Sequence, residues 1–464
     1  MPLIKSIAGV RGTIGGQVGD GLTPIDVVAL TTAFGRQLLH QSHGKRVVIG
    51  RDARPSGIVI SQLVSATLQS LGIDVIDLGL STTPTVAIAV HQEQASGGIV
   101  ITASHNPAEW NALKLLNQAG EYIDATTAAT VFSLAMQHDH TFAAAAHLGQ
   151  YFYKEGYIDE HIRQIIALPL VDQVAIAQRK FKVAVDAVNS TGGLAVPKLL
   201  QALGITHITK LHCQPTGLFP HDPEPLAEHL GELAAMVRGG EYDLGIAVDP
   251  DVDRLVIIDE QGQPWGEDYT LVAAADYVLS QTPGNTVSNL SSSSALKVLT
   301  EQYGGNYAAS AVGEMHVVAK MKATQAVIGG EGNGGVIYPA LHHGRDALVG
   351  MALILSHLAR SGKTASTLKA GYPSYVMAKS KIQLSPEIDV ATVLDKLKSQ
   401  YSQYPTDTAE GLKVNLHQGW FLLRKSNTEP VIRIYAEGVT QENATSLVAQ
   451  AKRDIQALIP IAVL

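Results

Sequence analysis

The chain contains one local pattern three times: a strand-like apolar run, a polar loop, a helical segment and a second strand-like run. The copies span residues 45–80, 181–212 and 285–313. In each copy the short apolar run of a buried strand gives way to the apolar spacing of an amphipathic helix. This alternation is typical of parallel α/β units, so the sequence predicts three related α/β domains.

The C-terminal part of the chain follows a different pattern. Strand-like segments over 371–384, 417–426 and 429–438 alternate with helical segments over 389–401 and 441–459. This order predicts a smaller α+β domain. The predicted domains therefore span residues 1–155, 156–257, 258–370 and 371–464, and they pack directly on each other because no low-complexity linker separates them.

The composition narrows the class of protein. A chain of 464 residues is too long for one compact core, and its net charge of −8 gives no support to nucleic-acid binding. The single cysteine, Cys213, excludes an intrachain disulfide, and no apolar stretch reaches membrane-spanning length. We expect a soluble cytoplasmic protein that has no membrane or nucleic-acid partner.

Three aspartates at alternate positions follow an apolar strand in the segment "AVDPDVDR". Because alternate side chains of an extended backbone point the same way, Asp249, Asp251 and Asp253 converge near the strand end. Such carboxylates repel one another unless a cation lies among them, and hard oxygen ligands in an incomplete set suit Mg²⁺. Arg254 follows at once and can hold an anion beside the metal. The alternative is a solvated acidic turn.

Ser104 ends the strand-like run "GGIVITA". A hydrolase nucleophile elbow would have glycines where Thr102 and Asn106 stand. His105 is expected to point away from the serine in extended chain, so no triad-type pairing is indicated. The serine can carry a phosphoryl group stabilised by loop N–H groups, or it can cap a turn. Taken alone, it favours the turn.

Two further loops carry polar side chains. "GGEGNGG", residues 329–335, fits a dinucleotide-binding spacing, but its glutamate would repel a pyrophosphate and no helix pattern follows. Glu331 and Asn333 suit sugar hydroxyls or an ammonium instead. "RKSNTEP", residues 424–430, offers a phosphate cradle without a metal. Its donors are Arg424, Ser426, Asn427 and Thr428. Each loop standing alone is also compatible with a plain turn.

Together these loops resemble the α-D-phosphohexomutase family over essentially the whole chain. The matching segments are "TASHNP" (102–107), "DPDVDR" (249–254), "GGEGNGG" (329–335) and "RKSNTEP" (424–430), supported by "GVRGT" (9–13), "GRDARPSG" (50–57) and "FPHDPEP" (219–225). The resemblance implies a heart-shaped molecule around a central cleft. Three of its domains are α/β with mixed sheets and the fourth is a smaller α+β domain.

The resemblance also implies a reaction. Phosphorylated Ser104 gives its phosphoryl group to a hexose monophosphate, a hexose 1,6-bisphosphate forms and turns around, and the other phosphate returns to the serine. Mg²⁺ is then held by the aspartates at 249, 251 and 253 and by a phosphoserine oxygen. Lys114 becomes the expected proton partner, and Arg11 and Arg254 add positive charge. A hexose 1,6-bisphosphate is the expected activator.

The remaining residues are expected to bind substrate. By the same resemblance, the loop from Arg424 to Thr428 binds the phosphate that does not react. Glu331 and Asn333 contact the sugar. His105 is expected to shape the loop around Ser104. His342 or His343 can replace a family histidine that is absent after Asn333, although a polar turn is the simpler interpretation.

The glutamate loop and "VGEMHVV", residues 312–318, look most like the phosphoglucosamine mutase branch, which points to glucosamine phosphate. The alternatives are a glucose or mannose phosphate mutase and a metal-dependent sugar phosphatase. The partner is a small phosphosugar, and the chain is expected to be a monomer or a homodimer.

Overall fold

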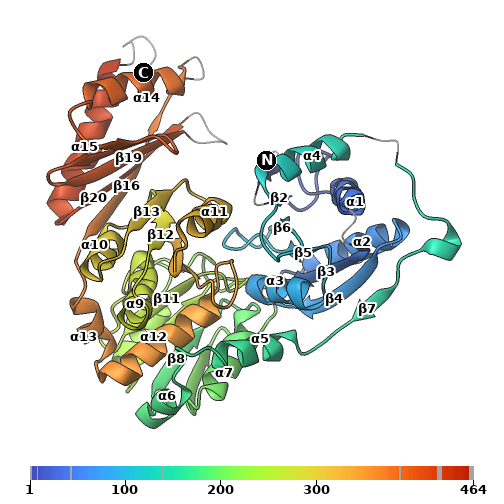
Figure 1. The fold of residues 1–464 in the computed structure, drawn as a ribbon, viewed down its shortest axis with the longest axis horizontal. Helices are drawn as coiled ribbons and strands as arrows, with labels where there is room; N and C mark the ends of the chain where they lie inside the picture. The colour runs from blue at the N-terminus through green and yellow to red at the C-terminus, as the bar shows by residue number, and fades with distance from the viewer. Residues whose placement is uncertain are drawn as a thin grey trace.

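The computed structural model describes residues 3–7, 9–41, 44–137, 140–385, 388–425 and 431–458. It confirms the predicted fold class of three α/β domains with mixed sheets followed by a smaller α+β domain. Figure 1 shows the first domain at the right, the last at the upper left, and the second and third between them. None of the described helices combines the length and apolar composition that crossing a bilayer requires.

The first sheet has the strand order β1-β2-β6-β5-β3-β4-β7. Its strands are β1 (Ile4–Ser6), β2 (Gly9–Thr13), β3 (Arg46–Arg51), β4 (Asp74–Leu80), β5 (Gly97–Ile101), β6 (Trp110–Leu116) and β7 (Tyr151–Tyr153). Apolar side chains of α1 (Pro24–His40), α2 (Gly57–Ser70) and α4 (Ala125–Ala135) cover one face, and those of α3 (Thr83–Gln92) cover the other.

The second and third sheets repeat the central part of the first. Their orders are β11-β10-β8-β9 and β13-β12-β14-β15, with parallel pairing except at the last hairpin. The strands are β8 (Lys182–Asp186), β9 (His207–Leu211), β10 (Leu244–Val248), β11 (Leu255–Asp259), β12 (Thr286–Asn289), β13 (Tyr307–Ser310), β14 (Ile328–Glu331) and β15 (Gly335–Ile337).

One apolar core joins these two domains. Its helices are α5 (Tyr157–Ile166), α6 (Gln173–Arg179), α7 (Gly192–Ala202), α9 (Glu267–Gln281), α10 (Ala295–Gln302), α12 (Ala347–Ser361) and α13 (Ala365–Ala370). The opposite faces are covered by α8 (Gly231–Gly239) and α11 (Glu314–Thr324). The shared core makes the two domains a single packed unit.

The last domain is an antiparallel sheet with two helices packed against it. The order is β16-β20-β19-β18-β17, and the bounds are β16 (Val376–Gln383), β17 (Thr406–Asp407), β18 (Leu412–Leu416), β19 (Gly419–Lys425), β20 (Val431–Gly438), α14 (Val390–Gln400) and α15 (Gln441–Leu458). Trp420 and Leu422 pack on Leu290 of the third domain, and Lys413 donates to the carbonyl of Leu290 at 2.8 Å.

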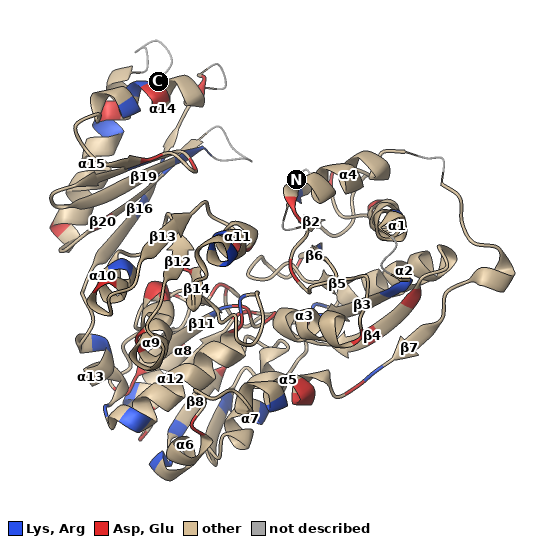
Figure 2. Cartoon of the chain, viewed as in Figure 1, with Lys and Arg blue, Asp and Glu red and all other residues tan. Residues whose placement is uncertain are grey.

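The repeat places three loops at equivalent positions. Each lies in the antiparallel hairpin at the edge of its repeat, between β5 and β6, between β10 and β11, and between β14 and β15. We call them the serine loop (102–109), the aspartate loop (249–254) and the glutamate loop (329–335, including the adjoining strand residues). Figure 2 shows acidic and basic residues gathered on the loops beside β11 and β14. The fold therefore brings the polar motifs of separate domains to one place.

Candidate active site

Ser104 lies in a strained turn whose carbonyl groups accept hydrogen bonds from a buried arginine. Its backbone φ is +49°, a left-handed conformation that is uncommon for a residue with a Cβ. The guanidinium of buried Arg54 donates to the carbonyl oxygens of Ser104 and Asn106, both at 2.6 Å, and to those of Pro107 and Trp110. This fork of donors fixes the loop and accounts for the persistence of the strained serine.

The serine hydroxyl points at the aspartate loop of the next domain. Its Oγ donates to Oδ2 of Asp249 at 2.6 Å, and the serine is only 6% exposed. Burial, together with repulsion from Asp253 and Asp251, raises the pKa of Asp249 well above its ordinary value. The hydroxyl of Ser104 therefore contacts a carboxyl group, that of Asp249, whose ionised form is disfavoured.

The three aspartates of the loop converge as predicted, but a tight turn brings them together and not the predicted extended backbone: Val252 has a φ of +64°, and its N–H donates to the carbonyl of Asp249 at 3.2 Å. One carboxylate oxygen from each lies within 4.8 Å of the others, and all three residues are fully buried. Oδ1 of Asp251 and Oδ1 of Asp253 have no hydrogen-bond partner among the described residues. Buried carboxylate oxygens without partners are costly, so this set of hard ligands fits a divalent cation.

Lys114 partly neutralises this cluster. Its Nζ lies 2.6 Å from Oδ2 of Asp251 and 3.5 Å from Oδ2 of Asp253. Burial alone would lower the pKa of Lys114, but the attraction of Asp251, Tyr122 and Asp253 outweighs burial and raises it. The same contact helps to lower the pKa of Asp251 against the effect of its own burial. The lysine is thus held as an ammonium beside the serine.

Arg345 connects the aspartate loop to the glutamate loop. Its guanidinium donates to Oδ2 of Asp253 at 2.6 Å, to Oε2 of Glu331 at 2.9 Å and to Oε2 of Glu314 at 3.0 Å. Glu331 also accepts from the side chain of Asn289 and the backbone of Gly313. The glutamate of the predicted sugar loop is therefore fixed relative to the predicted metal loop.

The two loops also touch through their backbones. The carbonyl of Gly334 accepts from the N–H of Leu255 at 3.0 Å. Gly334 has a φ of +87°, and a Cβ there would lie 2.6 Å from the carbonyl oxygen of Leu255. Only glycine fits this close approach.

A cavity of about 310 Å³ opens between these loops. Its lining includes predicted site residues of three domains: Arg11, Ser104, His105, Lys114, Arg254, Glu331 and Asn333. The structure thus brings these predicted residues together. His342 and His343 do not line this cavity: His342 lies against Asp346, and His343 lies near Glu121.

His105 lies closer to the serine than the sequence predicts. Its Nδ1 is 3.4 Å from Oγ of Ser104, so the expectation that the ring points away is wrong. The left-handed turn at Ser104 removes the strict alternation of an extended strand. Burial and the nearby charges of Arg254 and Arg11 lower the pKa of His105 to about 2, so the ring is neutral.

The two arginines that were predicted to add positive charge differ in their partners. Arg254 donates to Oε1 of Glu224 at 2.8 Å; its buried Nε has no hydrogen-bond partner among the described residues but lies 4.0 Å from Oδ2 of Asp249 and 3.9 Å from Oδ1 of Asp253. Arg11 donates weakly to the side chain of Asn106, and its buried Nε also lacks a partner in this part of the chain. Burial and repulsion by Arg254 lower the pKa of Arg11. Both guanidiniums retain N–H groups for an anion.

Arg424, the first residue of the predicted phosphate loop, lies beside a second cavity. Arg424 lines a space of about 520 Å³ that shares Arg254, Val312 and Asn333 with the first cavity. In this structure its Nε donates to Oε1 of Glu410 at 2.7 Å. Ser426, Asn427 and Thr428 lie outside the described residues.

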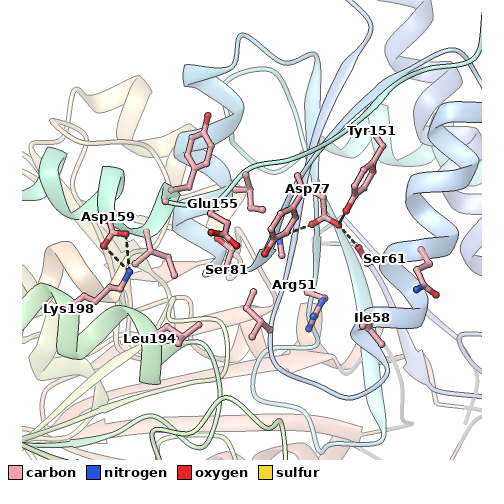
Figure 3. Close-up of a pocket in the computed structure, with 18 residues that line it drawn as sticks. Arg51, Ile58, Ser61, Asp77, Ser81, Tyr151, Glu155, Asp159, Leu194 and Lys198 are labelled. Carbon is pink, nitrogen blue, oxygen red and sulfur yellow. Dashed lines mark hydrogen bonds and ion pairs between the residues drawn. The ribbon is translucent and has the colours of Figure 1, made fainter.

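A larger cavity of about 860 Å³ lies elsewhere, between the first and second domains (Figure 3). Asp77 there accepts from Ser61 and from Tyr151, and Lys198 pairs with Asp159. None of the predicted site residues lines it. Volume alone therefore does not identify the site.

Sequence reasoning assigned no role to several residues that organise the site. Arg54 lies in the polar loop after β3, Glu314 begins α11, and Arg345 precedes the N-cap of α12. Thr83, which starts α3, donates to Oδ2 of Asp251 at 2.5 Å. Their common signal is a charged or polar residue in the loop after a strand or near a helix start.

Comparison with known proteins agrees with this geometry. Models of the phosphoglucomutase/phosphomannomutase family match domain I at residues 4–141, domain II at 156–262, domain III at 266–375 and the C-terminal domain at 376–453. The chain therefore belongs to the phosphoglucomutase/phosphomannomutase family of phosphohexomutases, a class of isomerases.

Individual relatives cover nearly the whole chain. A phosphoglucomutase/phosphomannomutase of Thermococcus kodakarensis is 36% identical over 94% of both chains. A probable phosphoglucosamine mutase of Methanopyrus kandleri is 32% identical over 95% of both. The crystal structure of a family protein from Burkholderia thailandensis superposes with a TM-score of 0.83 at 26% identity, covering 98% of both chains.

Proposed function

We propose that the chain interconverts hexose 6-phosphates and hexose 1-phosphates, with Ser104 as the phosphoryl carrier. The observation that carries this proposal is the meeting of the serine and aspartate loops: Oγ of Ser104 lies 2.6 Å from Asp249, beside Lys114 and in a cavity that also contains Glu331. A hydroxyl next to a cation site, with positive side chains around it, suits phosphoryl transfer.

In the first transfer the P–O bond to Ser104 breaks as the free sugar hydroxyl forms a new P–O bond. A hexose 1,6-bisphosphate results, and it turns around within the cavity. In the second transfer the other phosphate returns to the serine oxygen. The proton lost by the first sugar oxygen is regained by the oxygen that the second transfer frees, so the cycle is balanced.

Lys114 is the proposed proton partner of the sugar hydroxyl. In the structure Asp251 holds it as an ammonium, so it must become neutral to accept a proton. Mg²⁺ bound by the three aspartates and an oxygen of phosphorylated Ser104 would neutralise charge on the transferring group and, by repulsion, lower the pKa of the lysine. A hexose 1,6-bisphosphate would restore the phosphoserine and so act as activator.

The second cavity suits the phosphate that does not react. Arg424 and Arg254 both line it, and the loop that contains Ser426, Asn427 and Thr428 follows β19 directly. For Arg424 to hold a phosphate, its guanidinium must exchange Glu410 for the ligand. His105, as a neutral ring in the first cavity, is proposed to contact substrate and to shape the serine loop.

We propose glucosamine phosphate as the preferred substrate. Two buried carboxylates, Glu314 and Glu331, line the first cavity, and a carboxylate can accept from an ammonium as well as from hydroxyls. Asn333 also lines it, and its buried Oδ1 has no partner among the described residues. The alternative is glucose or mannose phosphate, which the name of the Thermococcus relative favours.

A direct comparison of substrates tests this proposal. We expect kcat/KM for glucosamine 6-phosphate to exceed that for glucose 1-phosphate and mannose 1-phosphate, with Mg²⁺ and a bisphosphate present. A higher value for a neutral sugar would overturn the substrate assignment. Release of inorganic phosphate faster than isomerisation would replace the mutase with a phosphatase.

The remaining sequence predictions stay proposals. We propose a cytoplasmic protein that acts on a small phosphosugar as a monomer or homodimer, with domain boundaries after residues 155, 257 and 370. The second sheet includes β11, Leu255–Asp259, which passes through residue 257. A proteolysis experiment that maps cleavage between the domains would refine these positions.

A further inference from the structure

An aspartate and two histidines meet in the second domain, outside the cavities described above. Asp186 ends β8, His212 directly follows the neighbouring parallel strand β9, and His221 lies in the segment "FPHDPEP". One ligand atom from each residue lies within 4.8 Å of those from the other two. The carboxyl ends of adjacent parallel strands are a common position for ligand sites.

The hydrogen bonds of His221 leave a lone pair facing a carboxylate. Its Nδ1 lies 2.8 Å from the carbonyl oxygen of Asp222, which can only accept, so this nitrogen carries a proton. In the neutral ring Nε2 then has no hydrogen, yet it lies 3.1 Å from Oδ2 of Asp186. This contact needs either a second proton on the ring or a metal cation between the two atoms; against the effect of burial, Asp186 raises the pKa of His221, so the ring carries two protons when no ion is bound. A tetrahedral ion with bonds of about 2.0–2.1 Å separates its ligands by roughly 3.3 Å.

His212 is held in a similar way. Its Nε2 lies 3.2 Å from Oε2 of Glu232, which accepts the hydrogen of that nitrogen. The lone pair is then on Nδ1. A carboxylate that fixes a histidine through its other nitrogen is the usual outer contact of a histidine metal ligand.

The exposure of the three side chains suits an ion that enters from solvent. The side chains of His212 and His221 are 19% and 20% exposed, whereas that of Asp186 is 2% exposed. Oδ1 of Asp186 accepts from the backbone of Val188 at 2.9 Å, which fixes the carboxylate and leaves Oδ2 for an ion. The neighbouring thiol of Cys213 is directed at the carbonyls of Val185 and Leu211 and does not join the set.

We propose that Asp186, His212 and His221 bind a divalent transition-metal ion of the zinc class, with the remaining position open to water. Two imidazoles and one carboxylate suit such an ion, whereas the all-carboxylate aspartate loop suits Mg²⁺. The proposal does not depend on the mutase reaction.

A second cluster of two histidines and an aspartate provides a comparison, because hydrogen bonds within the protein satisfy its side chains without an ion. His161 and His342 both lie against the same oxygen of Asp346, at 2.9 and 3.2 Å, and Nδ1 of His161 pairs with Thr85. His161 and Asp346 are fully buried, so their hydrogen bonds satisfy them without a ligand.

The proposed site touches the aspartate loop through two segments. Three residues after His221, Glu224 accepts from Arg254. After Asp186, the hydroxyls of Ser190 and Thr191 donate to the carbonyl of Pro250 at 2.7 and 2.8 Å. A bound ion would therefore join the strand ends that lie beneath the catalytic loops.

Metal titration of the untagged, chelator-treated full chain tests the proposal. Saturating Mg²⁺ is kept present so that Zn²⁺ does not compete for the aspartate loop. Calorimetry should show one equivalent of Zn²⁺ bound, and Co²⁺ should give the intense visible bands of a four-coordinate ion. H212Q and H221Q should each weaken Zn²⁺ binding at least about tenfold.

The matched control is H207Q, because His207 is an exposed histidine at the start of β9, the strand that His212 follows. It should bind Zn²⁺ as the unmodified chain does, and circular dichroism should show that all three variants are folded. The absence of stoichiometric Zn²⁺ binding would overturn the proposal and leave His221 and Asp186 as a proton-bridged ion pair. Equal binding by H212Q, H221Q and H207Q would also overturn it.

Discussion

The serine loop and the aspartate loop occupy the same position in two copies of one fold, yet different forces hold them. Arg54 holds the serine loop through neutral backbone carbonyls. Lys114 and Arg345 hold the aspartate loop through charged side chains. The charge of Arg54 is balanced by buried Asp52, and the carbonyls that it contacts are neutral. The aspartate loop carries carboxylates that Lys114 and Arg345 only partly neutralise, so we expect only this loop to respond strongly to an added cation.

This difference teaches how one repeat supplies two parts of a site. The hairpin after the third strand of the repeat has the same position in each copy, but the loop that it carries differs in length and composition. The serine loop runs over 102–109 and the aspartate loop over 249–254. The proposed phosphoryl carrier needs a rigid backbone beneath it, whereas the proposed cation site needs convergent carboxylates whose charge is only partly neutralised.

The largest expected effect is the loss of the proposed phosphoryl carrier, Ser104. S104A should reduce mutase activity at least about a thousandfold, since the variant has no oxygen to carry the group. A coupled assay with bisphosphate and Mg²⁺ measures this. S133A, on the surface of α4, is the matched control and should keep full activity. Comparable activity of S104A and the parent chain would remove the serine loop from the mechanism.

Removing one charge from the aspartate loop should have the next largest effect. D251N should lower activity about a hundredfold and should reduce the rise in melting temperature that Mg²⁺ produces, because a ligand is lost. Without metal the same variant loses the nearer of the two carboxylate partners of Lys114 and keeps Asp253. Scanning calorimetry with Mg²⁺ and with chelator separates the two effects. An undiminished Mg²⁺ response would show that the cation binds elsewhere.

Replacing Arg54 or Arg345 by lysine tests whether the serine loop and the aspartate loop are held independently. R54K should destabilise the serine loop by about 3 kcal/mol, since a lysine cannot reach the four carbonyls that Arg54 contacts. R345K should loosen the aspartate and glutamate loops instead, and Mg²⁺ should partly restore them. Hydrogen exchange of residues 102–109 and 249–254 reports each effect. If both loops loosen equally in both variants, the loops do not act as separately held units.

The smallest expected effect concerns pH. Burial raises the pKa of Glu314 to about 7, although Arg345 opposes this shift. Between pH of about 4.5 and about 7, the carboxyl group of Glu314 is therefore protonated in the folded state and ionised in the unfolded state. The resulting stability is fully present below a pH of about 4.5 and is lost as the pH rises through about 7, and it amounts to about 3 kcal/mol at about 1.4 kcal/mol per pKa unit.

E314Q should flatten this dependence of unfolding free energy on pH. Asp268 is the comparison, because burial raises its pKa to about 7 as well, but it lies in the second cavity rather than the first. D268N should also weaken the dependence of the unfolding free energy on pH in this range, but it should leave the contacts of the glutamate loop unchanged. An unchanged profile in E314Q would show that Glu314 does not titrate there.

Much of the fold was readable from the sequence because periodicity reports it directly. The three repeats predicted the three α/β domains, and the C-terminal pattern predicted the α+β domain, as the structure confirms. The convergence of the three aspartates was predicted from strand alternation and is present in the structure, although a turn with a left-handed Val252 produces it. These inferences needed only local backbone geometry.

The rest depended on contacts between distant segments. Arg54 and Arg345 act through residues roughly fifty to ninety positions away, and no local pattern marks such partners. The orientation of His105 depended on the left-handed backbone at Ser104, which an extended-strand assumption does not include. Residues 426–430 lie outside the described part of the chain, so the role of that loop stays a proposal.

Intact-mass spectrometry tests the central claim most directly. After incubation with a hexose 1,6-bisphosphate and Mg²⁺, the chain should gain about 80 Da, the mass of one phosphoryl group, and peptide mapping should place it on Ser104. S104A should show no gain under the same conditions. A consistent absence of the adduct, or its location on another residue, would contradict the account.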